Sequence, residues 1–148
     1  MRITFLLLLL AQLMGANHLS ARMFSTVKEC DMIYGKPTAP TDKTSDVRFY
    51  KHDGLTIKIL FAENKAAVIT YNSLTSLKIG PEAQQKLLNE NSGGNQWEEV
   101  VGEGARTWQR SDGQAFAIYD NATGELNMFS TDYIEKSKAE VQSAINEQ

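Results

Sequence analysis

The sequence of 148 residues predicts an α+β fold: an antiparallel sheet made from two units of one helix and a three-stranded meander, with helices covering one face and a helix at the C-terminus. Three observations predict this fold. Short segments alternate between apolar and polar residues and are separated by turn residues. A segment of helical period precedes each group of strands. This order of elements occurs twice, over residues 26–71 and 82–130.

The two halves align without a gap at an offset of 59 residues. That offset pairs Gly35 with Gly94, Phe49 with Trp108, Asp53-Gly54 with Asp112-Gly113, and Ile59 with Ile118. Few of these pairs are identities, so the repeat is indicated by shared turns and strand spacing rather than by a consensus.

Residues 1–21 are expected to be a signal peptide, cleaved between residues 16 and 23. Arg2 supplies a positive charge, residues 3–16 are almost entirely apolar, and small residues follow. This apolar run of 14 residues is shorter than the roughly 20 that span a bilayer, so a retained membrane anchor is the less favoured alternative. A lipid anchor would need a cysteine directly after the run, whereas Cys30 follows Val27-Lys28-Glu29.

Residues 22–148 are then expected to form a single exported domain, periplasmic or secreted, with no membrane span. Removal of Arg2 with the signal lowers Lys plus Arg from 15 to 14 against 18 Asp plus Glu, which leaves a net charge of −4. This charge argues against nucleic acid and anionic membrane as partners. A lone cysteine cannot form a disulfide within the chain.

The first unit begins with a short helix. Thr26 and Glu29 are three residues apart, as in a capping box, and Val27, Cys30 and Tyr34 recur at helical spacing. Gly35 followed by a proline ends the helix, and residues 36–46 read as an exposed loop.

Three strands follow the loop, at residues 47–52, 55–61 and 66–71. The middle strand alternates strictly, with Leu55, Ile57, Ile59 and Phe61 on one side. One face of the sheet is therefore expected to be buried under helices.

The second unit begins with a helix that runs from Gly80-Pro81 to Gly93-Gly94. A loop with Trp97 and Gly102-Glu103-Gly104 is expected next, before strands at 106–110, 114–119 and 125–130.

The last element is predicted to be a helix over residues 132–145. Asp132 and Glu135 have the spacing of a second capping box, and Ile134, Val141, Ala144 and Ile145 form an apolar stripe. We expect this helix to close over the sheet.

Cys30 and His52 are the candidate nucleophile and base, because a thiol needs a base within hydrogen-bonding reach to become a thiolate. The favoured interpretation is structural. Cys30 lies on the apolar stripe of its helix, where a free cysteine acts as a small buried hydrophobe, and His52 lies at the mouth of a hairpin.

Other candidate motifs also have structural explanations. Asp53 and Asp112 occupy equivalent turns and resemble an acid–base pair, but Asp before Gly is itself turn chemistry. The spacing of His and Cys gives no metal-ligand pattern, so no metal and no cofactor are expected. Asn121-Ala122-Thr123 fits both a glycosylation acceptor and a hairpin tip.

The strand patterns predict which residues lie on each face of the sheet. The covered face is expected to hold Val47, Phe49, Leu55, Ile57, Ile59, Phe61, Ala67, Ile69, Trp108, Phe116, Ile118, Leu126 and Met128. The opposite face is expected to present Arg48, Tyr50, Lys58, Leu60, Tyr119 and Phe129. Aromatic residues mixed with cations suit a docking site, but they also form ordinary cross-strand pairs on a solvated sheet, and both interpretations stay open.

A helix, Tyr34-Gly35-Lys36-Pro37, a polar loop and a meander occur in that order, and in this the chain resembles the SmpA/OmlA outer-membrane assembly family. The doubled unit is similar to the tandem architecture of β-lactamase-inhibitor-like exported proteins. The resemblance implies a non-enzymatic protein that docks a partner protein with its sheet face or loops. The chain departs from the assembly family in lacking a lipidation cysteine.

These observations predict an exported, non-enzymatic module that binds a protein of the envelope or extracellular space. Its binding residues are expected to be Arg48, Tyr50, Lys58, Tyr119 and Phe129. The alternative is a small hydrolase or small-ligand-binding protein that uses Cys30 with His52, or the Trp97 loop.

Overall fold

A computed structural model describes residues 22–38, 46–75, 77–102 and 104–146; the expected signal peptide at residues 1–21 lies outside them. The elements follow in the order α2 (Val27–Tyr34), β1 (Val47–His52), β2 (Leu55–Ala62), β3 (Lys65–Ser73), α3 (Pro81–Glu90), β4 (Trp97–Val100), β5 (Arg106–Arg110), β6 (Ala115–Asp120), β7 (Glu125–Ser130) and α4 (Thr131–Asn146). The predicted α+β class is confirmed.

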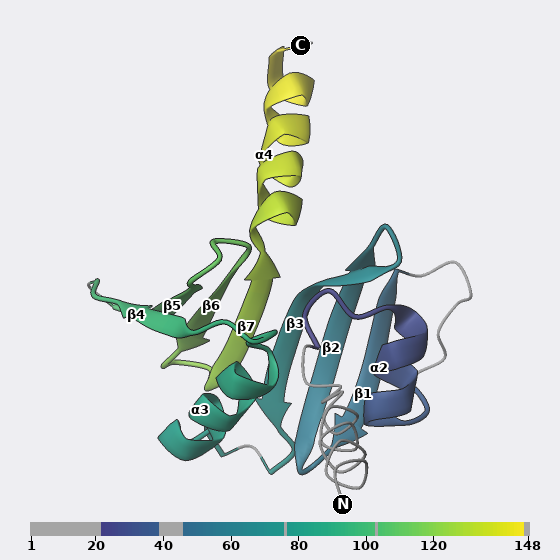
Figure 1. The fold of residues 1–148 in the computed structure, drawn as a ribbon, viewed down its shortest axis with the longest axis vertical. Coiled ribbons are helices and arrows are strands. Elements are labelled where there is room, and N and C mark those ends of the chain that lie inside the picture. The colour runs from purple at the N-terminus through teal and green to yellow at the C-terminus, as the bar shows by residue number, and fades with distance from the viewer. Residues whose placement is uncertain (1–21, 39–45, 76, 103, 147–148) are drawn as a thin grey trace, which may run out of the picture.

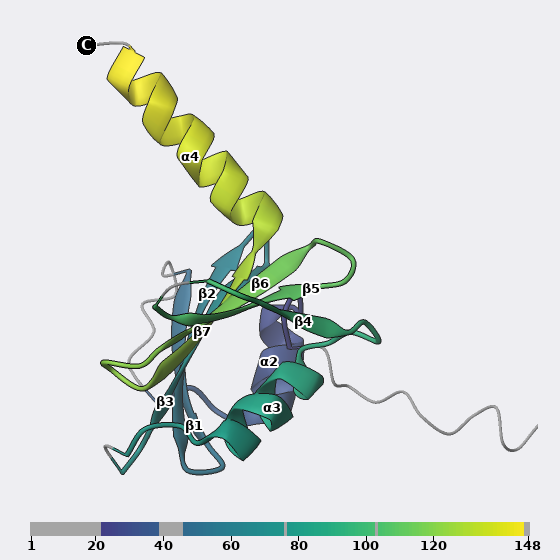
Figure 2. The ribbon, with the colours of Figure 1, turned by 90° about the vertical axis from the view of Figure 1, so that its left-hand side faces the viewer.

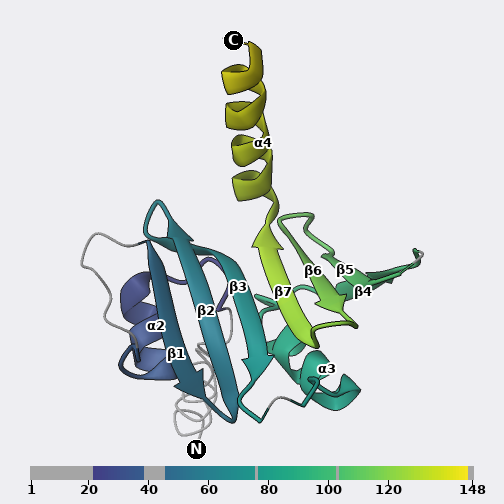
Figure 3. The same ribbon diagram turned by 180° about the vertical axis from the view of Figure 1, so that it is seen from behind.

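All strands belong to one seven-stranded antiparallel sheet with the order β1-β2-β3-β7-β6-β5-β4 (Figure 1). The two meanders meet through their last strands, β3 and β7, which lie side by side in the middle of the sheet. Helices α2 and α3 pack on the same side of the sheet (Figure 2). Seen from the opposite side, no described helix covers the sheet (Figure 3).

The strands lie close to their expected positions, and β1, β5 and β7 have the expected bounds. The turns between them contain residues with a positive φ, namely Asp53-Gly54, Glu63-Asn64, Gly113 and Gly124, and all of these except Glu63 are types that tolerate it. The exception is β4. Trp97–Val100 is a strand that pairs with β5, whereas a loop was expected there.

The capping box at the start of α2 is confirmed. The Glu29 backbone N–H donates to Thr26 Oγ1 at 3.3 Å, and the Thr26 backbone N–H donates to Glu29 Oε2 at 2.7 Å. At the other end of α2, Gly35 adopts a φ of 85°, which its missing side chain permits.

The core lies between the sheet and the two packed helices. The sheet contributes Ile57, Ile59, Ile69, Tyr71, Trp108, Leu126 and Met128, while Cys30 and Tyr34 come from α2 and Leu87 and Leu88 from α3. Met23 also joins this core, because the Phe24 N–H donates to the Ala66 carbonyl at 3.0 Å and anchors the segment before α2 to β3. The core is therefore completed by residues ahead of the first described helix.

A polar network crosses this core between α2, β3 and α3. Tyr34 and Tyr71 share a hydrogen bond between their hydroxyls at 3.1 Å, and Asn91 Nδ2 donates to the Tyr71 hydroxyl at 3.0 Å. Asn91 Oδ1 accepts the Met23 backbone N–H at 3.0 Å. These buried polar groups are paired, as the loss of water requires.

Helix α4 does not close over the sheet, and that prediction is wrong. It projects away from the domain beyond the end of β7 (Figure 1), and none of its residues is buried. It also begins at Thr131, where the Ser130 hydroxyl accepts the Tyr133 N–H at 3.4 Å, so the N-terminal cap is Ser130 and not Asp132.

Among the described residues, no helix combines the length and apolar character needed to cross a membrane.

Candidate interaction surface

The side of the sheet opposite α2 and α3 is called the open face. Cross-strand partners share a face, so the strand pairing identifies its residues. On β1 to β3 it carries Val47, Phe49, Lys51, Thr56, Lys58, Leu60, Val68, Thr70 and Asn72, and on β5 to β7 it carries Thr107, Gln109, Phe116, Ile118, Asp120, Glu125, Asn127 and Phe129. Its apolar residues are concentrated in one part of the face.

One row of residues across the open face is apolar over five neighbouring strands. Val47 pairs with Leu60, Leu60 with Val68, Val68 with Phe129, and Phe129 with Phe116. These five residues are called the apolar row. Four strand spacings of about 4.8 Å give the row a length of roughly 19 Å. All five side chains are half-buried by one another and by the sheet.

One end of the apolar row is an aromatic pair. The rings of Phe116 and Phe129 stack with centroids 5.0 Å apart and an interplanar angle of 20°. Stacked aromatic side chains form a rigid apolar surface at little conformational cost. Beside the row, Phe49 is 42% exposed and stands opposite the exposed Lys58.

Polar groups border the apolar row on one side. Thr70 and Asn127 are cross-strand partners, and the Thr70 hydroxyl donates to Asn127 Oδ1 at 2.8 Å. An apolar centre with a polar border is the usual composition of a protein-binding surface.

Two of the expected binding residues, Arg48 and Tyr50, lie on the covered face, so their placement was wrong. The Tyr50 hydroxyl donates to Asp31 Oδ1 at 2.8 Å, and Arg48 Nη1 lies 3.2 Å from Asp31 Oδ2. Both side chains therefore attach β1 to α2. Tyr50 is 1% exposed, and its pKa is raised by burial and by the hydrogen bond to Asp31.

Tyr119 was also misplaced, because it is buried on the covered face as the partner of Leu126. Phe116 and Ile118 were expected there and instead lie on the open face. The physical reason is that both faces of β6 are apolar, and its fully buried positions are the small Ala115 and Ala117. Val47 and Phe49 were misplaced in the same way on β1.

Lys58, Leu60 and Phe129 lie on the open face, as expected. The sequence reasoning missed Val68, and the misplaced Val47, Phe49 and Phe116 complete the surface. The Asp31 carboxylate on α2 was a signal that could have placed Arg48 and Tyr50 correctly, because it gives both side chains a polar partner on the covered side.

The offset of 59 residues pairs side chains on opposite faces. It aligns the open-face Phe49 with the covered Trp108, whereas Tyr50 is the β1 residue that is buried on the same face as Trp108. The strands follow the repeated order of elements. Side chains of β1 and β5 that lie on the same face, however, are related by an offset one residue shorter than 59.

Cys30 is fully buried, at 0% exposure. Burial is the main cause that raises the pKa of its thiol to about 12, and the neighbouring Asp31 and Glu29 carboxylates add to it. The thiol is therefore protonated at neutral pH. The His52 ring packs edge-on against Tyr34 with centroids 5.7 Å apart, and its Nε2 lies 3.6 Å from Asp53.

The two turn aspartates have different surroundings. Asp112 binds Arg110 through two contacts, from Nε at 2.9 Å and Nη2 at 2.7 Å, and this guanidinium lowers the pKa of the carboxyl. Asp53 lies 3.5 Å from Lys86 and is mostly exposed. Each carboxylate has a cationic partner, and Arg110 also stacks over Phe24 at 5.0 Å.

Trp97 was expected in a loop and instead begins β4, where it packs against the edge of the core. Its indole nitrogen is buried and makes no hydrogen bond to the described residues. Within the described residues, no group of three His, Cys, Asp or Glu side chains could hold a metal ion. Of the Gly102-Glu103-Gly104 segment, residue 103 lies outside the described part.

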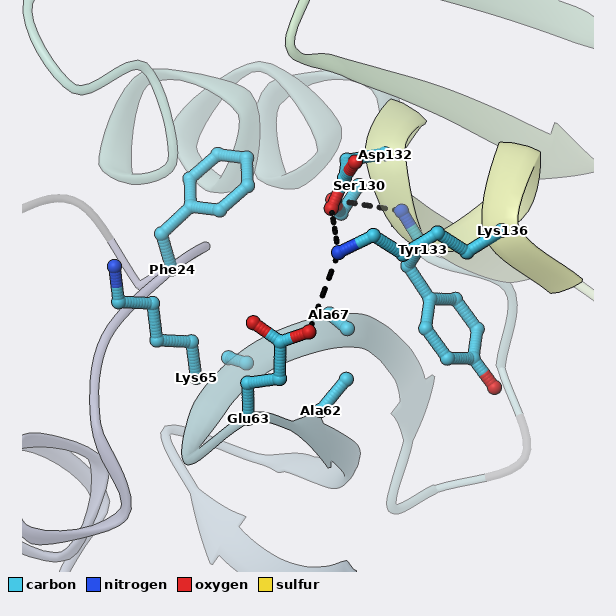
Figure 4. A pocket seen from close by; sticks show the side chains of 10 residues that line it. Phe24, Ala62, Glu63, Lys65, Ala67, Ser130, Asp132, Tyr133 and Lys136 are labelled. Atoms are coloured by element: carbon cyan, nitrogen blue, oxygen red, sulfur yellow. Dashed lines mark hydrogen bonds and ion pairs between the residues drawn. The ribbon is translucent and has the colours of Figure 1, made fainter.

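A hollow of about 220 Å³ lies between the β2–β3 turn and the start of α4 (Figure 4). Lys136 spans it, with Nζ 3.2 Å from Glu63 and 3.0 Å from Asp132. Phe24 and Tyr133 supply aromatic walls. The Lys136–Glu63 ion pair connects α4 to the domain, whereas the Lys136–Asp132 pair lies within the helix.

The sequence matches no protein-family model and no curated protein. Among solved structures, the chain is similar to the crystal structure of a DUF4309 family protein (YjgB) from Bacillus subtilis subsp. subtilis strain 168. The two share 15% identity with a TM-score of 0.41, over 78% of this chain and 84% of that chain. The function of the present chain has to be argued from its own residues.

Proposed function

We propose that the protein is an exported, non-enzymatic module that binds a partner protein through the open face of its sheet. The observation that supports this proposal is the apolar row, which lies uncovered among the described residues. Solvated sheet faces of single domains are usually polar, so an apolar row of this kind supports a role in binding.

The partner that fits this surface is a protein with an apolar centre of its own. The stacked Phe116 and Phe129 offer flat contact area, Phe49 adds an exposed aromatic edge, and Lys58 supplies a cation beside it. Rigid aromatic side chains beside a charged group are typical of the residues that dominate binding energy.

The hydrolase alternative has weaker support. A nucleophilic cysteine needs a thiolate, and burial raises the pKa of the Cys30 thiol to about 12. Trp97, which that alternative places in a loop, begins β4, the strand at one edge of the sheet. These side chains are better explained as parts of the core.

A photo-crosslinking group at position 49 tests the proposal in the exporting cell. We expect it to form an adduct with a partner protein, whereas the same group at Met32 should not. Met32 is a matched control because it is 66% exposed and lies on α2, away from the open face. Equal adducts at both positions would refute the surface.

A second variant tests the apolar row itself. Leu60→Asp should remove the adduct formed from position 49, because it places a charge within the row, on the strand next to position 49. Met32→Asp should leave that adduct unchanged. A thermal melt of both variants shows whether the domain remains folded.

A further inference from the structure

Helix α4 exposes an apolar stripe that the rest of the domain does not use. Val141 and Ile145 are 61% and 60% exposed, and Ile134 lies about two and three turns before them on the same side. A helix of 16 residues with few tertiary contacts is only marginally stable in water. The stripe therefore needs a partner surface.

The base of α4 is fixed in a direction that leads away from its own sheet. The Thr131 N–H donates to the Gln114 carbonyl at 3.0 Å, and the Thr131 hydroxyl donates to the Gly113 carbonyl at 2.9 Å. On the other side, Lys136 lies 3.2 Å from Glu63. No linker separates β7 from α4, so the helix cannot fold back onto the open face without breaking these contacts.

The stripe has the spacing of a coiled coil. Ile134, Lys138, Val141 and Ile145 are separated by four, three and four residues, which is the pattern of the two core positions of a heptad. The small side chains of Ser137 and Ala144 flank them.

A groove lies on this stripe, lined by Ile134, Ser137, Lys138, Val141 and Gln142. The first four of these residues are spaced as the four that surround one side chain of a facing helix in a coiled coil. This groove can accept a side chain of a facing helix.

We propose that α4 pairs with α4 of a second copy of this chain, in an antiparallel coiled coil. Among the described helices, α2 and α3 already bury apolar residues against the sheet. Only α4 has none buried. In the antiparallel register Ile134 faces Ile145 of the second copy and Lys138 faces Val141, so the stripe is complementary to itself.

The charges on α4 decide between the possible arrangements. A parallel pair would set Lys138 directly against Lys138 of the second copy, while the antiparallel pair places it against an apolar residue past which its long side chain can reach water. An anionic membrane is a poor partner, because Asp132, Glu135 and Glu140 outnumber the lysines at 136 and 138.

Sedimentation equilibrium of the purified protein tests the pairing. Two helices of this length make a small interface, so we expect reversible dimers between about 10 μM and 1 mM. Val141→Glu should abolish the dimer, while Ser143→Glu, on the opposite side of α4, should not. Lys138→Leu should tighten it about tenfold. A wild-type protein that remains monomeric at about 1 mM would overturn the proposal.

Disulfide crosslinking tests the direction of the pair. Cys30 is buried, so an introduced cysteine is the only accessible thiol in the described part of the chain. When Ser137→Cys and Ala144→Cys proteins are mixed under a mild oxidant, an antiparallel pair forms mainly the mixed disulfide. A parallel pair in register holds positions 137 and 144 about 10 Å apart along the helix axis and cannot favour the mixed disulfide, so absence of that disulfide would contradict the proposed register.

Discussion

Asp31 connects α2 to the edge strand β1 through two different side chains. Its carboxylate accepts a hydrogen bond from the Tyr50 hydroxyl at 2.8 Å and pairs with Arg48 at 3.2 Å. Tyr50 is buried and Arg48 is partly exposed, so the tyrosine is the better measure of what this contact contributes. Both residues are thus part of the fold and do not belong to the binding surface.

Tyr50→Phe should lower the free energy of unfolding by about 1–2 kcal/mol, because it removes a hydrogen bond to a charged acceptor and keeps the ring. Urea unfolding measures this change. The same variant should keep the crosslink from position 49, since Tyr50 faces away from the open face. Loss of binding with unchanged stability would show that the structural assignment is wrong.

The Cys30 thiol should be protected from alkylation in the folded protein. It is fully buried and burial raises its pKa to about 12, so both access and ionisation are suppressed at pH 8. Iodoacetamide labelling followed by mass spectrometry should show modification only after denaturation. Rapid labelling of the native protein would contradict the packing of α2.

Stability should fall as the pH rises above about 9. The pKa of the Cys30 thiol is raised from 9.0 to about 12 in the folded protein. The shift therefore stabilises the folded state fully below pH 9.0, and this stabilisation is lost as the pH rises from 9.0 to about 12. Burial also raises the pKa values of Tyr34 and Tyr71, which act in the same direction. Urea unfolding from pH 8 to 11 measures the decline, and Cys30→Ala should make it shallower.

At the scale of single elements, the positions of strands were predictable and the faces of some strands were not. Asp53-Gly54, Gly113 and Gly124 mark turns through local backbone preference, which needs no tertiary information. By contrast, β6 alternates between alanines and large apolar residues, and local pattern does not say which set is buried. Burial of Ala115 and Ala117 depends on residues that are distant in sequence.

The errors at β4 and α4 have related causes. Trp97 was assigned to one loop with Gly102-Glu103-Gly104, although it begins β4, where Glu98 and Glu99 are charged residues of the kind that protect an exposed sheet edge from pairing with other chains. The stripe on α4 was correctly identified as apolar, but a stripe does not specify the surface that it packs on. Two of the five expected binding residues, Lys58 and Phe129, lie on the open face, as the alternation of residues along their strands predicted.

The β6–β7 turn depends on a close approach at Gly124. This residue has a φ of +77°, and a Cβ there would lie 2.8 Å from Lys78 Cγ and 2.9 Å from Lys78 Cα. Gly124→Ala should therefore destabilise the domain by more than the strain of the positive φ, which alone costs about 1–2 kcal/mol. Gly54→Ala is the matched control, with a φ of +75° and nothing within 4 Å. Equal losses in urea unfolding would contradict the proposed approach.

At the scale of the whole molecule, a single layer of two short helices covers one side of a wide sheet. The other side and α4 both expose apolar residues among the described parts of the chain. The domain has enough core to fold as it stands, since the buried cluster runs from Cys30 on α2 to Trp108 on β5. The exposed apolar surfaces are therefore available for contacts with other molecules.

Removal of the outer part of α4 should hardly affect the fold of the domain. A chain that ends after Lys136 keeps the ion pair to Glu63 and the Thr131 contacts at the base of the helix, and it loses no buried residue. We expect a change of thermal midpoint within about 4 °C, which corresponds to roughly 1 kcal/mol or less for a domain of this size. If α4 instead closed over the sheet, the same truncation would expose part of the core and lower the midpoint far more. Calorimetry at low protein concentration distinguishes the two, because dimers through α4 are then dissociated.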